Sequence, residues 1–130
     1  MKREMFFTVT GIVAMLFGIG FVLVPAMSLA MYGVPTEPHN LMQSRYFGSA
    51  LLAVGIISYL ARDTQDPLAW RAILWGGLVM DLIGLGVSFS AAGSLQNEMA
   101  WGSVVLYAVF AAGGAYFLFG AKQPAPAAAA

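Results

Sequence analysis

Four long apolar runs constrain the fold of this 130-residue chain more than any other feature of its sequence. A helix needs roughly 20 predominantly apolar residues to cross the hydrocarbon core of a bilayer. The runs cover residues 5–24, 41–60, 68–90 and 99–119. We expect one transmembrane helix over each run, in a single domain over residues 1–121, and a disordered tail over residues 122–130. The predicted fold class is an all-α integral membrane four-helix bundle.

The composition agrees with this fold and excludes several kinds of chemistry. The chain is 60% hydrophobic and only 9% charged, whereas soluble domains carry roughly 25% charged residues. A formal net charge of zero provides no basic field to attract nucleic acid. The absence of cysteine excludes disulfides and thiolate chemistry, and a single histidine excludes a multi-histidine metal site within one chain. The sequence leaves the cofactor unknown, and it contains no nucleotide-binding, zinc-protease or serine-hydrolase motif.

Local signals predict where the helices begin and end. Asp66-Pro67 is typical of an N-cap followed by proline at the first helical position. Pro25 is expected to end the first helix, and Asn40 and Asn97 are candidate caps for the second and fourth helices. The third helix is expected to close at Gly93-Ser94, and the fourth at Gly120. The first run partly resembles a signal peptide, but its apolar region exceeds the usual length of about 7–15 residues, so we expect it to be retained.

The distribution of positive residues predicts the orientation of the helices. Lysine and arginine in short loops favour the cytoplasmic side of a membrane. The loops over residues 26–39 and 91–98 contain neither residue type. We therefore expect these two loops outside and both termini in the cytoplasm, together with Lys2, Arg3, Arg62, Arg71 and Lys122.

Small residues recur four positions apart in each predicted helix. Such pairs let helix backbones approach closely, which matters because lipid provides no hydrophobic drive between helices. We expect most of them to pack within the bundle. The alternative is that one stripe forms a seam for a homo-oligomer or for another membrane protein. The pairs are Ala14/Gly18, Ser44/Gly48, Gly86/Ser90, Ala108/Ala112 and Ala111/Ala115.

Arg45 and Asp81 are the charged residues that interrupt the apolar runs. An isolated charge at the centre of a membrane helix costs at least about 2.5–3.5 kcal/mol on insertion scales. At 1.5 Å per residue, Arg45 lies roughly 22 Å from the inner end of the second helix, and Asp81 lies roughly 20 Å from that of the third. We therefore predict an Arg45–Asp81 ion pair. It would act as a clamp between helices or as the polar floor of a ligand or proton site.

Further polar residues are predicted at the outer mouth of the bundle, around Arg45. His39 is the candidate for a pH-sensitive or ligand-contacting group, with a solvated loop position as the alternative. Residues 27–33 are apolar for a loop, which predicts a short helix on the membrane surface or a lid over the mouth. The candidate mouth residues are His39, Gln43, Tyr46, Gln96, Asn97 and Glu98.

The arrangement resembles the DoxX-like group of small four-helix bacterial membrane proteins. The resemblance rests on Pro25 at the end of the first helix, on Tyr32-Gly33, and on Arg45-Tyr-Phe-Gly48 followed by Leu51-Leu52 and Gly55. It implies a multi-pass protein of the bacterial plasma membrane, with Arg45 and Gly48 as the matching positions. Because some members are linked to quinone-associated redox complexes or to other membrane proteins, it also implies an accessory or small-ligand role.

Several functions therefore stay open at this point. The first hypothesis is a non-enzymatic accessory or assembly subunit of a membrane protein complex, because no catalytic constellation is present. The second is an intramembrane binder of a small apolar ligand such as a quinone or lipid, with Arg45, Asp81 and His39 near its polar end. The third is a membrane oxidoreductase subunit or an oligomeric transporter. Small multidrug transporters are similar in size, but their essential glutamate in the first helix has no equivalent after Glu4.

Overall fold

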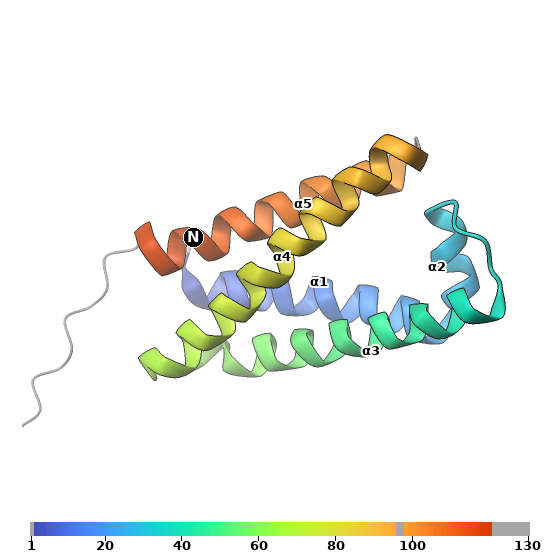
Figure 1. Ribbon diagram of the computed structural model, residues 1–130. Coiled ribbons are helices and arrows are strands. Elements are labelled where there is room, and N and C mark those ends of the chain that lie inside the picture. Colours follow the sequence, from blue (N-terminus) through green and yellow to red (C-terminus); the bar gives the residue numbers. More distant parts are fainter. Residues whose placement is uncertain (1, 96–97, 121–130) are drawn as a thin grey trace, which may run out of the picture.

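In the computed structural model (Figure 1), residues 2–95 and 98–120 are described, without the side chains of residues 93–95. All regular elements in these ranges are helices, and four segments are long and apolar enough to cross a membrane. The predicted all-helical bundle is therefore confirmed. The predicted tail lies outside the described residues. The elements are α1 (Arg3–Leu23), α2 (Pro25–Met31), α3 (Pro38–Leu60), the 3-10 helix η1 (Ala61–Asp63), α4 (Pro67–Leu95), α5 (Glu98–Ala115) and the π-helix η2 (Tyr116–Gly120).

Two of the predicted helix ends are wrong, and those at Pro25 and at Asp66-Pro67 are confirmed. The Asp66 carboxylate accepts a hydrogen bond from the backbone N–H of Leu68 at 2.9 Å, as expected of an N-cap. Asn40 does not cap α3, because that helix already begins at Pro38, and the Asn40 amide instead donates to the carbonyl of Pro35. The helix predicted to close at 93–94 continues to residue 95. The predicted cap Asn97 lies outside the described residues.

The apolar stretch after α1 forms the short helix α2, as its composition predicts. Pro25 occupies the start of α2, where its missing N–H and fixed φ are tolerated. The segment then leaves the helix at Gly33, whose φ of 68° lies in the left-handed region that favours glycine. This turn returns the chain towards α3 and places Tyr32 beside the rest of the bundle.

The helices are arranged as two pairs that Figure 1 shows diverging towards the α2 end. α1 packs against α3, and α4 packs against α5. In the first pair, a Cβ on Gly18 would lie 2.7 Å from the Leu52 nitrogen and 2.8 Å from the Gly48 carbonyl oxygen. Gly11 of α1 and Gly55 of α3, seven residues away from Gly18 and Gly48 respectively, approach each other in the same way. Glycine at these four positions thus sets the spacing between α1 and α3.

The small-residue pairs differ in what they contact. Gly18, Ser44 and Gly48 are buried between α1 and α3, in agreement with the prediction of packing within the bundle. Gly86 instead has open space where a Cβ would lie, and Ala108 and Ala112 are exposed. Packing within the bundle was therefore the wrong prediction for Gly86 and for the Ala108/Ala112 pair, because these residues do not face the contact between α4 and α5.

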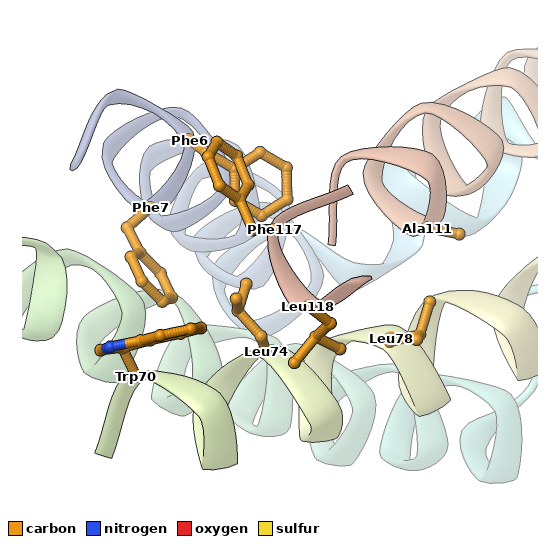
Figure 2. Packing of buried hydrophobic residues seen from close by; sticks show 8 residues of the cluster. All are labelled: Phe6, Phe7, Trp70, Leu74, Leu78, Ala111, Phe117 and Leu118. Carbon is orange, nitrogen blue, oxygen red and sulfur yellow. The ribbon is translucent and has the colours of Figure 1, made fainter. Parts of the chain in front are cut away.

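A core of aromatic and aliphatic side chains joins the two pairs at the end opposite α2 (Figure 2). The Phe7 side chain is 2% exposed, and the Phe6 and Phe117 ring centroids lie 5.4 Å apart. Arg3 adds a polar link there, since its guanidinium donates to the Thr64 carbonyl and lies over the Trp70 ring. The core residues are Phe6, Phe7, Trp70, Leu74, Leu78, Ala111, Phe117 and Leu118.

Candidate functional site

An open cleft of about 630 Å³ lies between the helix pairs at the α2 end. This volume falls within the range of about 300–1,000 Å³ that is usual for small-molecule sites. Its walls come from α1, α2 and the segment after it, the first half of α3, α4 from Met80 onward, and α5. The cleft exists because the core joins the pairs at one end only, while consecutive helices α3 and α4 diverge from their shared connection.

A narrower cavity of about 80 Å³ borders this cleft and extends towards the core. The two spaces share six lining residues from five parts of the chain. Most of the narrow cavity is lined by apolar side chains, and its polar residues are Thr10, Tyr32, Ser58, Asp81, Ser103 and Tyr107. The shared residues are Phe21, Tyr32, Phe47, Met80, Ser103 and Tyr107.

A hydrogen bond crosses the boundary between the cleft and the cavity. The hydroxyl oxygens of Tyr32 and Ser103 lie 2.9 Å apart and join the segment after α2 to α5. The Tyr32 ring stacks on Phe21, with 6.0 Å between the ring centroids. Tyr32 therefore lines both the wide cleft and the narrow cavity and connects the two helix pairs at their open end.

Asp81 is the charged residue of this site. It lies at the middle of α4, is 4% exposed and lines the narrow cavity. Among the described residues, its carboxylate makes no hydrogen bond and no ion pair. A buried carboxylate without a partner is costly, and such groups in membrane helices usually serve ligand or ion pathways. The structure thus presents a carboxylate that interacts electrostatically with Tyr107 but forms no hydrogen bond or ion pair with another described residue.

The predicted Arg45–Asp81 ion pair is absent. Arg45 is exposed, and no ion pair joins it to the buried Asp81. Similar depth along two consecutive helices does not bring the side chains together here, because α3 packs on α1 while α4 packs on α5. Ser44, the residue before Arg45, faces that α1–α3 contact and hydrogen-bonds to the Phe21 carbonyl, which directs Arg45 to another side of α3.

The candidate mouth residues lie in different surroundings. Gln43 lines the wide cleft, and Asn40 lies beside it in the same wall. His39 is exposed and lies 3.5 Å from a Glu37 carboxylate oxygen, outside both cavities. Tyr46 and Glu98 are exposed and line neither cavity, and the predicted mouth residues 96 and 97 fall outside the described ranges.

Sequence reasoning missed the hydroxyl groups of the site. Tyr107 was not singled out, although it lines both spaces and its ring fills the position beside Gly84 of α4. Ser58 was missed too, and it is 6% exposed on the cavity wall. A tyrosine or serine within an apolar run at roughly the depth of Asp81 was the available signal. This signal becomes specific only once it is known which helices pack against each other.

The unpaired carboxylate leads to a stability prediction. The Asp81→Asn variant is expected to melt at a higher temperature than the wild type, because an amide is less costly to bury than an unpartnered charge, by about 1–3 kcal/mol. The three tryptophans allow the melting to be followed by intrinsic fluorescence in detergent. Asp63→Asn is the control, since Asp63 is exposed beside Arg62 and its loss is expected to have a small effect. A marked fall in melting temperature for Asp81→Asn would show that the carboxylate has a stabilising partner.

No cluster of three or more histidine, cysteine or acidic residues that could hold a metal ion occurs in the described part of the chain. Comparison with known proteins adds no family. No protein-family model, curated protein or solved structure matches this chain, and the resemblance to the DoxX-like group stays a prediction from the sequence.

Proposed function

We propose that this protein crosses a bacterial plasma membrane four times and binds a small, mainly apolar molecule in the cleft between its two helix pairs. Both termini lie in the cytoplasm in this proposal, and α2 lies at the outer surface. The observation that carries it is the apolar cleft with the unpartnered Asp81 carboxylate at its inner extension.

The surface of the bundle supports the placement in a membrane. Large apolar side chains are exposed along every long helix, including Leu16, Ile57, Ile83 and Val105. A contiguous apolar surface of this kind fits a lipid environment. The described positive residues of the N-terminus and of the α3–α4 connection lie at the end opposite α2, where Arg3 contacts Thr64 and Trp70. Their position fits the cytoplasmic side.

The shape and chemistry of the cleft support the binding role. A ligand site is typically concave, mostly apolar, and equipped with a few polar groups that orient the ligand. Here the apolar walls come from both helix pairs, and the hydroxyl-bearing residues Tyr32, Ser103 and Tyr107 line both the wide cleft and the narrow cavity. A ligand can therefore bury its apolar body in the cleft and direct a polar group towards Tyr107 and Asp81.

Binding can be tested with 1-naphthalenemethanol, a neutral, mainly apolar probe. We expect saturable binding by the purified protein in equilibrium dialysis against empty dodecyl maltoside micelles. Ser88→Phe is expected to weaken this binding by about tenfold, because Ser88 lines the wide cleft and the larger side chain would occupy it.

Gly86→Phe is the matched control for this experiment. Gly86 lies two positions away on α4, is exposed, and has open space around its Cβ position. Its replacement should leave probe binding within about twofold of the wild type. The binding function would be contradicted if the protein sample took up no more probe than empty micelles. If Ser88→Phe and Gly86→Phe weakened probe binding equally, the probe would bind outside the cleft.

An accessory role is the second candidate, and one observation favours it. The face of α4 that carries Gly86 makes no contact at that glycine within the described residues, so another helix can approach the backbone closely there. Gly86→Phe would then abolish co-purification of a stoichiometric membrane protein while leaving the cleft intact.

A further inference from the structure

We infer that the molecule bound in the cleft is a lipophilic cation whose protonated amine pairs with the Asp81 carboxylate. This inference rests on the proposed binding function and names the chemical class of its ligand. It starts from an imbalance in the charges of the site. Asp81 lines the narrow cavity, whereas no lysine, arginine or histidine of the described chain lines either space.

The hydroxyls of Thr10, Tyr32 and Ser103 are hydrogen-bonded within the protein, whereas those of Ser58 and Tyr107 make no hydrogen bond among the described residues, and Asp81 is the charged group of the cavity. The hydroxyl of Thr10 donates to the Phe6 carbonyl, and that of Ser103 lies 3.2 Å from the Met99 carbonyl and 2.9 Å from the Tyr32 hydroxyl. These hydroxyls are occupied within the protein. The Asp81 carboxylate, a far stronger acceptor, has no donor among the described residues. An ammonium group brings both the donors and the charge that this carboxylate lacks.

Aromatic rings add a second feature that favours a cation. Rings from α1, from the segment after α2, from α3 and from α5 all border the narrow cavity. The face of an aromatic ring attracts a cation within about 6 Å of its centroid, and more strongly where water is excluded. The rings concerned include Phe17, Phe21, Tyr32, Phe47, Tyr107 and Phe110.

The sizes of the two spaces specify the shape of the ligand. The narrow cavity of about 80 Å³ holds a small head group, and the adjoining cleft of about 630 Å³ holds a larger body. An aminomethyl group on a bicyclic aromatic body has this shape.

The inference is tested with two probes of nearly the same shape. 1-Naphthylmethylamine carries an ammonium at pH 7, and 1-naphthalenemethanol carries a neutral hydroxyl in its place. In equilibrium dialysis, corrected for uptake by empty micelles, the wild type is expected to bind the amine at least about tenfold more tightly than the alcohol. Asp81→Asn is expected to abolish this preference while leaving the affinity for the alcohol within about twofold.

Glu98→Gln is the matched control, because Glu98 is an exposed carboxylate that lines neither cavity. It should keep the full preference for the amine. Equal affinity of the wild type for both probes would overturn the cation inference and leave the proposed binding function standing. Binding of neither probe would overturn both. Because the comparison of probes on the wild type is decisive by itself, the test holds even where Asp81→Asn fails to fold.

Discussion

Replacing Gly18 by valine is expected to lower the free energy of unfolding by about 3 kcal/mol, near the upper end of the range for overpacked positions. A Cβ at this position would lie within 3.0 Å of backbone atoms of α3, at Gly48 and Leu52. Backbone cannot rotate aside as a flexible side chain can, so α1 and α3 would have to separate. Unfolding in mixed dodecyl maltoside and SDS micelles measures the change.

Gly76→Val is the control for this substitution. Gly76 is also a helical glycine, but nothing lies within 4 Å of its Cβ position. Because valine has a helix propensity at least equal to that of glycine, the free energy of unfolding of Gly76→Val should differ from that of the wild type by less than about 1 kcal/mol. Equal destabilisation of Gly18→Val and Gly76→Val would show that the α1–α3 contact is looser than the structure has it.

The second large effect is expected at the core that joins the two helix pairs. Phe7→Ala should destabilise the protein by about 3–5 kcal/mol, as is usual for the loss of a fully buried aromatic side chain. Phe7 is 2% exposed, and it packs in the cluster that contains Trp70 and Leu74 of α4 (Figure 2). The same unfolding titration measures this loss.

Leu16→Ala provides the comparison on the same helix. Leu16 is 65% exposed, so its truncation removes few contacts within the protein and should change the free energy of unfolding by less than about 1 kcal/mol. Similar losses for Phe7→Ala and Leu16→Ala would mean that the cluster does not hold the pairs together. The cleft would then not be a fixed feature of the fold.

The sequence predicts the helices of this protein well, because their length and apolar character are local properties. Asp66-Pro67 marks the start of α4, and the apolar stretch from Pro25 predicts α2. The ends are less predictable where strong breakers are absent: Pro38 rather than Asn40 begins α3, and Gly93 is no barrier to α4. Side-chain signals of this kind are weak compared with packing.

The site is only half predictable, because it depends on which helices pack together. Asp81 stands out in the sequence as a charge within an apolar run, and it does line a cavity. Its pairing with Arg45 assumed that consecutive helices stay adjacent along their length, whereas the glycines at 18 and 48 hold α3 against α1. Tyr107 becomes a candidate only once the contact between α4 and α5 is known.

Asp81 illustrates a conflict between stability and function. A carboxylate that is buried without a partner works against the stability of the fold, and residues of this kind are retained where binding or catalysis needs them. The structure offers no compensating contact for it within the described residues. The cost is explained if a ligand supplies the missing partner when it binds.

Native mass spectrometry of the protein, extracted gently from the membranes of the cells that produce it, tests the central claim most directly. The account predicts that the chain retains a small molecule, and that Ser88→Phe removes this added mass while Gly86→Phe does not. A wild-type chain that is always free of small molecules, whether alone or with a stoichiometric protein partner, would contradict ligand binding in the cleft.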